Sequence, residues 1–510
     1  MESMNDMSPS SPTAHFDLPA AAADLTLPRP AQPCADGEGQ TLVDAASGRP
    51  FAFVPHTSPE EAEAIVAAGR ETFEEGAWRT MPVGERAAIM RQVSALILEH
   101  AEELARLQTL ETSIVIAQSR GMHVARTAEN FTFFADLLAG HSGETYEQSG
   151  RYLSIVTREP VGLAVLIAPW NAPLVLASMK LAAAISLGNS VILKPSEYAP
   201  LAILRLVELI HEAGVPRGVV QVACGTGPGI GDALVGHVGV DVVGFIGGTH
   251  TGKKIMARAA GSLKKVGLEL GGKSANIVLA SADLERAVDG SLMAIYAGNG
   301  EQCLAGSRIL VEESIADAFI ARFVERTRAL RIGDPFDPES EIGPMAFAAH
   351  YEKLMAFADL AHEDPAYKVL TGAARAAGME DGYYFAPTVV ETSDNATRLC
   401  QEELFGPFAM VQRVADLDEA LSIANDSEFG LASYIWSNDL PSVMRARREL
   451  RAGTVWVNTP MARDLRSPFG GYKQSGIGRD GLPGSIELFT EEKTTLIPQD
   501  PLTLPKMGMH

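Results

Sequence analysis

The sequence predicts an α/β protein: a doubly wound, Rossmann-type parallel sheet, a second α/β region and a small projecting arm. Between residues 161 and 278, short apolar runs alternate with helical stretches, a pattern typical of a parallel sheet covered on both faces. The chain has 510 residues, too many for one hydrophobic core, which indicates two or three domains. Ligands of such sheets bind beyond the carboxyl ends of the strands, so we expect the site there.

The first part of the chain predicts an extension followed by helices. Residues 1–38 are rich in Pro, Ala, Ser and Asp and lack periodicity, which predicts a flexible extension. From Ser58 to Leu107 the pattern is mostly helical, with Ser58 in the N-cap position. A second strong helix is expected within that span, over about 83–99.

The first α/β region predicts five strands and two intervening helices. The strands are Val161–Ile167, Val191–Leu193, Val219–Val222, Val242–Ile246 and Val266–Leu268, and the helices are Pro200–Ala213 and Thr249–Ala260.

The second α/β region is expected from about Gly271 to Arg463. It contains predicted strands at Asn276–Leu279 and Arg308–Val311, and a helix from Ser314 to about Leu330. The segments His141–Arg158 and Ile486–Ile497 alternate weakly in polarity, and they predict the arm.

Composition excludes several classes of function. The net charge is −22, with 64 acidic and 42 basic residues, which disfavours nucleic acid and anionic membranes as partners. The apolar runs are far shorter than a membrane span, and the N-terminus has no signal-peptide pattern. Four cysteines are too few for a disulfide framework. We therefore expect a soluble, cytoplasmic protein. The 11 histidines show no ligand spacing, so no metal site is expected.

Six short segments carry the chemistry. They are Pro169-Trp170-Asn171-Ala172-Pro173, Lys194-Pro195-Ser196-Glu197, Leu268-Glu269-Leu270-Gly271-Gly272-Lys273, Gly300-Glu301-Gln302-Cys303-Leu304-Ala305-Gly306-Ser307-Arg308, Glu402-Glu403-Leu404-Phe405-Gly406-Pro407 and Ser467-Pro468-Phe469-Gly470-Gly471. In this order, over about residues 40 to 500, they closely resemble the aldehyde dehydrogenase superfamily. The resemblance implies an NAD-binding domain (39–140 and 159–270), a catalytic domain (271–465) and an oligomerisation arm (141–158 and 486–497), in a homodimer or homotetramer.

Three residues are the catalytic candidates. A Cys and a Glu in glycine-flanked turns suit a thiolate that attacks a carbonyl and a carboxylate that later activates water. Taken alone, the Cys would be a buried apolar residue and the Glu a solvated cap. The resemblance assigns Cys303 as nucleophile, Glu269 as general base, and Asn171 with the Cys303 N–H as donors to the alkoxide. Glu301 replaces the usual Gln of the family, and its carboxylate would raise the thiol pKa only if it pointed at the sulfur.

The resemblance implies NAD as cofactor, with NADP as an alternative. It places Lys194 and Glu197 on the adenosine ribose, where a carboxylate would repel a 2′-phosphate. Without the resemblance, Lys194 and Glu197 would be interpreted as residues that cap a helix. Gly247, Gly248 and Gly252 open a helix after a strand and suit a pyrophosphate, although the family usually has Ser at 248 and Glu at 250. The remaining cofactor candidates by resemblance are Ile167, Trp170, Glu403 and Phe405.

The substrate is expected to be a small aldehyde. The stretches around Arg126 and Arg463-Asp464-Leu465-Arg466 look like the muconic semialdehyde dehydrogenase branch. In that branch, arginines matching Arg126 and Arg466 bind the substrate carboxylate, and Phe469 lies close in sequence to the substrate tunnel. The upstream Asp-Ile-Pro of that branch is here His123-Val124-Ala125. Three alternatives stay open: arginines in structural ion pairs, a broad aromatic or aliphatic aldehyde dehydrogenase, and a non-catalytic structural or binding member.

Overall fold

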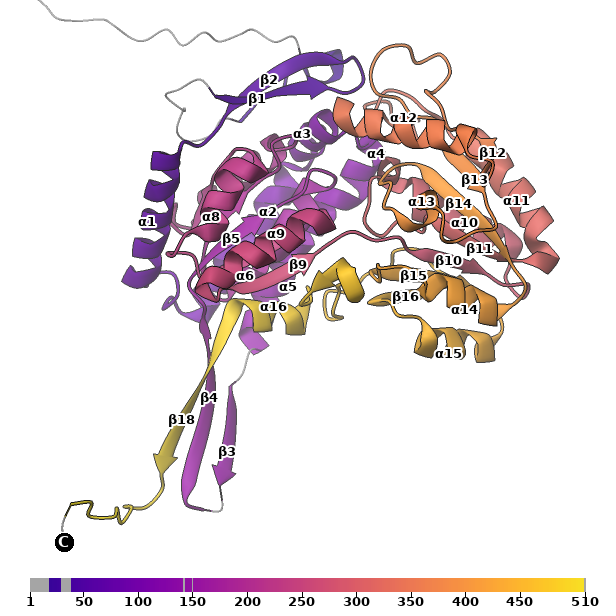
Figure 1. The fold of residues 1–510 in the computed structure, drawn as a ribbon. Helices are drawn as coiled ribbons and strands as arrows, with labels where there is room; N and C mark the ends of the chain where they lie inside the picture. Colours follow the sequence, from indigo (N-terminus) through magenta and orange to yellow (C-terminus); the bar gives the residue numbers. More distant parts are fainter. Residues whose placement is uncertain (1–17, 29–37, 141–142, 149, 509–510) are drawn as a thin grey trace, which may run out of the picture.

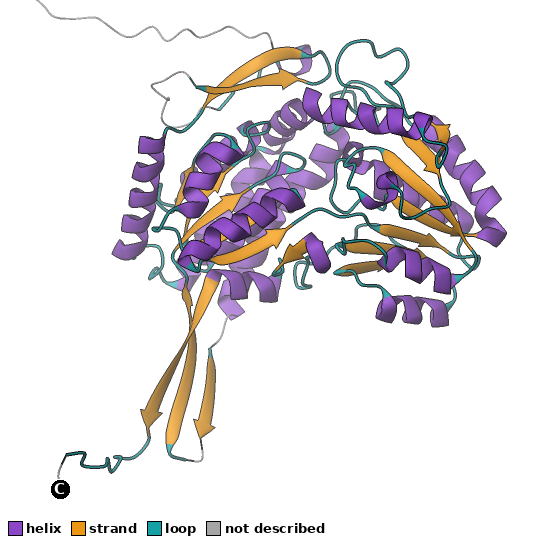
Figure 2. Cartoon of the chain, in the orientation of Figure 1, coloured by secondary structure: helices purple, strands orange, loops and turns teal. Residues whose placement is uncertain are grey.

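The chain folds into two α/β halves with an arm that projects from one of them (Figure 1). The structure, a computed structural model, describes residues 18–28, 38–140, 143–148 and 150–508. Most of the predicted extension, residues 1–17 and 29–37, therefore lies outside the described residues, as does Cys34. Figure 2 shows helices packed around a central sheet in each half.

The first half contains a six-stranded sheet in the order β17-β9-β8-β5-β6-β7, counted over the described residues. Every pairing is parallel except that of β17 with β9. The chain runs outward from β5 to β7 and then restarts on the other side of β5, which confirms the predicted doubly wound sheet. The strands are β5 (Leu163–Ile167), β6 (Ser190–Lys194), β7 (Val220–Val222), β8 (Val242–Ile246), β9 (Lys265–Glu269) and β17 (Gly476–Ile477).

Helices cover both faces of this sheet, as Figure 2 shows. Helix α1 begins with the predicted cap: the Ser58 hydroxyl accepts the Glu61 N–H, and the Glu61 carboxylate accepts the Ser58 N–H. The helices of this half are α1 (Pro59–Glu75), α2 (Val83–Glu99), α3 (Ala101–Thr112), α4 (Ile116–Gln118), α5 (Val124–Gly140), α6 (Pro173–Ser186), α7 (Leu201–Glu212), α8 (Asp232–Gly236) and α9 (Thr249–Ala259). A hairpin of β1 (Gly39–Asp44) and β2 (Arg49–Pro55) precedes them.

The second half contains a seven-stranded sheet over the described residues, of which the sequence predicted only two strands. Its order is β12-β13-β14-β11-β10-β15-β16, and β12 alone pairs antiparallel, at an edge. The strands are β10 (Ala275–Val278), β11 (Arg308–Glu312), β12 (Lys368–Thr371), β13 (Thr388–Glu391), β14 (Phe408–Val414), β15 (Ala432–Trp436) and β16 (Thr454–Val457). Its helices are α10 (Leu284–Tyr296), α11 (Glu313–Arg328), α12 (Ala348–Glu363), α13 (Arg398–Gln401), α14 (Leu417–Asn425) and α15 (Leu440–Glu449).

The arm is a three-stranded antiparallel sheet in the order β18-β4-β3. Its strands are β3 (Glu144–Gln148), β4 (Tyr152–Pro160) and β18 (Thr490–Pro498). The prediction placed the start of the second arm segment at Ile486, which was wrong, because residues 486–489 end helix α16 (Leu482–Phe489) and pack against the first half. The domain limits themselves stay predictions.

Candidate active site

A cavity of about 330 Å³ collects residues from both halves. Asn171 follows β5, Gly247 and Gly248 follow β8, and Glu269 ends β9. These positions are the carboxyl ends of the strands at which the chain order reverses, where doubly wound sheets bind ligands. The second half contributes Cys303, Phe347, His350, Lys353, Glu403 and Phe405 to the same cavity.

Cys303 lies in a tight turn that glycines make room for. A side chain at Gly272 would meet the carbonyl oxygen of Cys303, and one at Gly300 would meet the backbone of Gly406. Gly300 also has a φ of +72°, which favours glycine. Burial raises the pKa of the Cys303 thiol to about 12, and the charges of Glu403 and Glu269 act in the same direction. The resting sulfur is therefore a thiol, and its attack on a carbonyl requires a base.

Glu269 is buried at the end of β9, and its Oε2 atom has no hydrogen-bond partner among the described residues. Burial, and after it the charge of Asp480, raises the pKa of Glu269 well above its ordinary value. A carboxyl group with a raised pKa is suited to general-base catalysis near neutral pH. Gly470 leaves space for this carboxylate, because a side chain there would lie 2.7 Å from Glu269 Oε1.

Asn171 is fixed by the turn that carries the thiol. Its Nδ2 atom donates to the Glu301 carbonyl oxygen over 2.8 Å. An amide nitrogen has two hydrogens, so one remains for an oxygen that forms on the carbon attached to Cys303. The Glu301 carboxylate points elsewhere: its Oε1 atom accepts the Ala346 N–H over 3.0 Å, and Glu301 is not among the groups that raise the pKa of Cys303.

Aromatic rings and Glu403 form the wall contributed by the second half. The Trp170 ring packs edge-on against Phe347 and Phe405, with centroids 5.1 and 5.4 Å away. Phe405 has a φ of +66°, an unusual value for a residue with a side chain. Glu403 Oε1 accepts the Gly272 N–H over 2.9 Å, and a side chain at Gly271 would meet the same carboxylate.

The remaining predicted cofactor residues lie along the ends of β5, β6 and β8. Ile167 is the last residue of β5, and Lys194, the last of β6, donates to Glu197 over 3.2 Å. Gly248 is the N-cap of α9 and has no capping side chain, so the first N–H groups of α9 are available to an anion. Gly252 lies deeper, in the packing contact between α9 and Leu270, which fits a packing role better than contact with a pyrophosphate.

Arg463 approaches the catalytic residues and Arg126 lies near Arg463, whereas Arg466 does neither. Burial lowers the pKa of Arg463, and the charges of Asp480, Arg126, Glu269 and Cys303 also act on its guanidinium. The guanidinium lies 4.4 Å over the Phe469 ring and contacts Met179. Arg466 is 76% exposed at its side chain and pairs with Asp464 over 2.6 Å. The assignment of Arg466 to the substrate therefore needs correction: the surface ion pair occupies it, and Arg463 is the guanidinium beside the site.

The family follows from comparison with known proteins. The profile of the aldehyde dehydrogenase family matches residues 34–495, most of the chain. The chain belongs to the aldehyde dehydrogenase family.

Two curated relatives and a solved structure show how close the similarity is. The chain is 41% identical to 5-carboxymethyl-2-hydroxymuconate semialdehyde dehydrogenase of Escherichia coli, over 87% of this chain and 92% of that protein. It is 37% identical to 2-aminomuconic semialdehyde dehydrogenase of Danio rerio, over 89% and 94%. A betaine aldehyde dehydrogenase from Staphylococcus aureus, crystallised with NAD+, superimposes with a TM-score of 0.91 at 35% identity, covering 94% and 97%.

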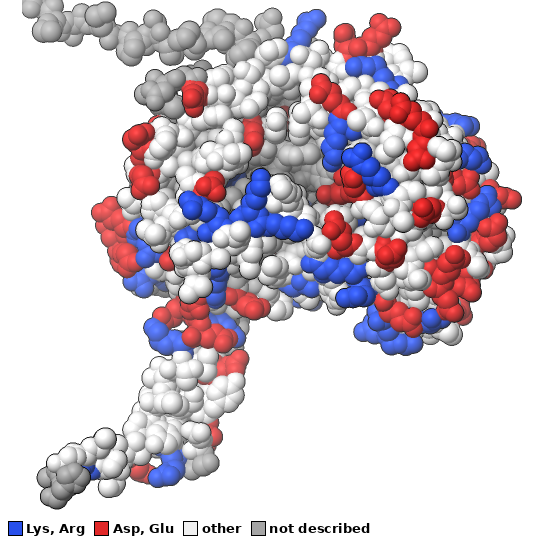
Figure 3. All heavy atoms as spheres, in the orientation of Figure 1, with Lys and Arg blue, Asp and Glu red and all other residues white. Residues whose placement is uncertain are grey.

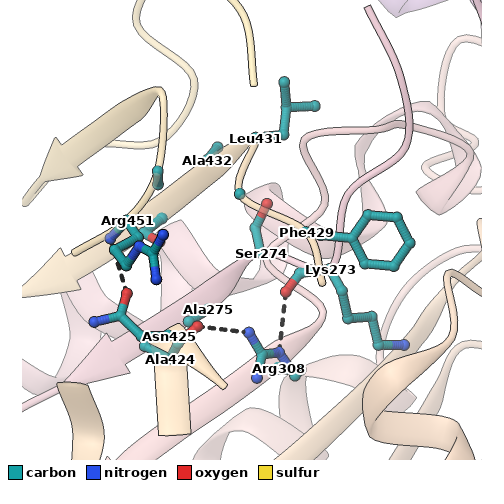
Figure 4. A pocket seen from close by; sticks show the side chains of 13 residues that line it. Lys273, Ser274, Ala275, Arg308, Ala424, Asn425, Phe429, Leu431, Ala432 and Arg451 are labelled. Carbon is teal, nitrogen blue, oxygen red and sulfur yellow. Dashed lines mark hydrogen bonds between the residues drawn. The ribbon is translucent and has the colours of Figure 1, made fainter. Parts of the chain in front are cut away.

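A second, smaller pocket of this aldehyde dehydrogenase lies in the second half, at β10, β11 and β15 (Figure 4). Its volume of about 10 Å³ is close to that of one water-sized probe, which excludes a substrate. Arg308 lines this pocket and donates to the carbonyl oxygens of Lys273, Ile423 and Ala424. The buried guanidinium therefore links the segment before β10 to the end of α14. In the described parts of the chain, we find no group of three potential metal ligands and no helix long and apolar enough to cross a membrane.

Sequence reasoning missed two features of the site. Lys180 and Asp480 form an ion pair of 2.7 Å in which both side chains are almost fully buried, and the charges of both act on Glu269. A single charge within the otherwise apolar helix α6 was a signal for Lys180, because a buried charge requires a partner. His350 gave no comparable signal.

Proposed function

We propose that this aldehyde dehydrogenase uses NAD to oxidise a semialdehyde that already carries a carboxylate. The released product then has two carboxylates. The observation that carries the proposal is Arg463: its guanidinium lies beside Glu269 and Cys303, and among the described residues it forms no ion pair, since Asp480, whose charge acts on it most strongly, is paired with Lys180. Arginine binds carboxylates through two parallel N–H groups. The two muconic semialdehyde dehydrogenases among the relatives agree with this class of substrate.

Arg126 is the second proposed contact to the substrate carboxylate. Its own partner is distant, since Arg126 Nε lies 3.9 Å from Glu129 Oε2, and a weak surface pair leaves the guanidinium available. Two neighbouring guanidinium groups repel each other, and a bound carboxylate relieves that repulsion. A cationic substrate such as betaine aldehyde would increase it.

The cofactor proposal rests on the donors at the strand ends. Free N–H groups at the start of α9 suit a pyrophosphate, and the Lys194–Glu197 pair at the end of β6 suits ribose hydroxyls. When bound, the dinucleotide supplies a hydride acceptor. NADP stays an alternative, disfavoured by the negative charge of Glu197.

The residues then perform the following steps. The Cys303 thiol loses its proton to solvent, and the thiolate attacks the aldehyde carbon. The alkoxide that forms accepts hydrogen bonds from Asn171 Nδ2 and from the Cys303 N–H. Loss of hydride from this carbon leaves a thioester. Glu269 next takes a proton from water, the hydroxide attacks the thioester, and the carboxylic acid leaves as the Cys303 thiolate is restored.

The substrate proposal is tested with Arg463→Ala and with Arg466→Ala as the matched control. The assay compares kcat/KM for a muconic semialdehyde and for the methyl ester of its carboxyl group. Loss of a charge-assisted contact should lower kcat/KM about thirtyfold for the acid, with little change for the ester. Arg126→Ala should act in the same direction, and Arg466→Ala should leave both substrates within about twofold.

Equal losses on acid and ester in Arg463→Ala would instead favour the broad aromatic or aliphatic aldehyde dehydrogenase. The non-catalytic alternative predicts no NADH formation with any aldehyde in a panel.

We also propose a cytoplasmic homodimer or homotetramer that pairs through the arm. The visible surface of the arm is largely uncharged beyond its base (Figure 3). Tyr146, Leu496 and Ile497 are 55%, 60% and 45% exposed there. Apolar side chains on an open sheet edge favour pairing with another chain, and sedimentation analysis would give the state of assembly.

A further inference from the structure

The loop that carries Phe405 is held by a histidine that lines the same cavity. His350 Nε2 lies 2.7 Å from the Phe405 carbonyl oxygen. A carbonyl only accepts hydrogen bonds, so the ring proton is on Nε2. Burial lowers the pKa of His350 to about 4, and the ring is neutral at pH 7 with this single N–H. This hydrogen bond fixes the carbonyl group of Phe405. The φ of Phe405 is +66°, a backbone conformation that is strained for any residue other than glycine.

The same histidine is linked to the turn of the nucleophile. Glu301 Oε1 lies 3.6 Å from His350 Nε2 and accepts the Ala346 N–H over 3.0 Å. The Glu301 carbonyl oxygen accepts Asn171 Nδ2 over 2.8 Å. Glu301 is thus one residue that touches both the alkoxide donor and the segment that ends at His350.

We infer that Glu301 and His350 are positioning residues. Together they hold the Cys303 turn at a fixed position relative to the Phe405 loop on the other side of the cavity. Cys303 lies on one side of this cavity, and Phe405 lines another. Hydride transfer from the carbon on the sulfur requires reacting atoms about 3–3.5 Å apart. A loop that drifts relative to the sulfur lengthens that distance without removing any reacting group.

The test uses two amides that differ in reach. In His350→Gln, the amide nitrogen reaches the place of Nε2 and can still donate to Phe405. In His350→Asn, the side chain is equally polar but one methylene shorter, so it reaches only the place of Nδ1. We expect His350→Asn to lower kcat for aldehyde oxidation about tenfold, and His350→Gln to retain it within about threefold.

Three readouts distinguish positioning from a general structural role. With an aldehyde deuterated at the carbonyl carbon, the isotope effect on kcat should increase in His350→Asn, because hydride transfer becomes slower. Hydrolysis of p-nitrophenyl acetate without nucleotide uses Cys303, Asn171 and Glu269 but no hydride transfer, and it should stay within about twofold. Crystal structures without nucleotide should show Phe405 leaving the positive φ region in Asn but not in Gln.

The following results would overturn the inference. Parallel losses of oxidation and ester hydrolysis would make His350 a residue of general stability. A raised KM for NAD at unchanged kcat would make it a direct contact to the dinucleotide. Activity of His350→Asn equal to that of the wild type would exclude any role.

Glu301→Leu tests the second link of the chain. It should reduce oxidation as His350→Asn does, and the double variant should lose no more than either single one. Additive losses would show that the two residues act separately, and would overturn their joint role.

Discussion

The two walls of the active site are built at opposite ends of their sheets. In the first half, Asn171, Gly248 and Glu269 stand at the carboxyl ends of β5, β8 and β9. In the second half, Cys303 precedes β11 and Phe405 precedes β14, so both stand near amino ends of parallel strands. The rule that ligands bind beyond carboxyl ends thus locates the base and the alkoxide donor, and it does not locate the nucleophile.

The walls also differ in the backbone that presents the side chains. Gly300 and Phe405, with φ values of +72° and +66°, flank the second wall, and Asn299 has a φ of +59°. Of these, Asn299 is held by its own side chain, which donates to the Ser113 and Pro344 carbonyl oxygens over 3.0 and 3.2 Å. The first wall uses strand ends that the sheet itself fixes. Positions of the second wall therefore depend on tertiary contacts, and they should respond more to distant substitutions.

Removal of the thiol should have the largest effect, because it deletes the reactive group of the second wall and leaves the first wall intact. Cys303→Ala should reduce the rate of aldehyde oxidation to below about 3% of the wild-type rate. NAD binding, measured by calorimetry, should stay near normal. Cys400→Ala is the control from the same half, since Cys400 is buried outside the cavity. Substantial turnover by Cys303→Ala would remove Cys303 from the mechanism.

Removal of the base should separate the two chemical steps. In Glu269→Gln we expect a burst of NADH equal to the active sites and then a steady state about a hundredfold slower, because hydrolysis of the thioester lacks its base. Stopped-flow absorbance gives both phases. If the burst disappears together with the steady state, Glu269 is needed to form the thiolate rather than chiefly to activate water.

The pH dependence should show the raised pKa values on both walls. The thiolate of Cys303 and the carboxylate of Glu269 are the active forms, and both increase with pH because both pKa values lie above their ordinary values. We expect kcat/KM to rise from pH 6.5 to 9, by up to about tenfold per pH unit. A profile that is flat or falls over this range at constant ionic strength would mean that the groups are already ionised.

The nucleotide end of the first wall should give the smallest effect. Glu197→Ser removes a charge that would lie near a 2′-phosphate, so the ratio of kcat/KM for NAD to that for NADP should fall by about fivefold. The change in this ratio should come from the KM values for the two nucleotides rather than from kcat. Values for both nucleotides that match wild type would place Glu197 away from the ribose, in its ion pair with Lys194 alone.

The sequence alone predicted the five parallel strands of the first sheet, and it named the candidate reactive groups. Apolar runs gave the strands of the first sheet within one or two residues at most ends, and Ser58 gave the start of α1, because these signals are local. Gly271 and Gly272 after Glu269 signalled close backbone approach, which the contacts of Gly271 with Glu403 and of Gly272 with the Cys303 carbonyl oxygen confirm.

Only the tertiary structure decided which of two chemically alike residues reaches the site, and which distant residues meet. Arg463 and Arg466 are three residues apart in one irregular segment, and no periodicity in such a segment fixes which side chain points inward. Lys180 and Asp480 meet across 300 residues, and His350 meets Phe405 only because α12 and the loop before β14 fold together. Local propensity carries no information about such contacts, since burial and pairing arise only when segments distant in the sequence pack together.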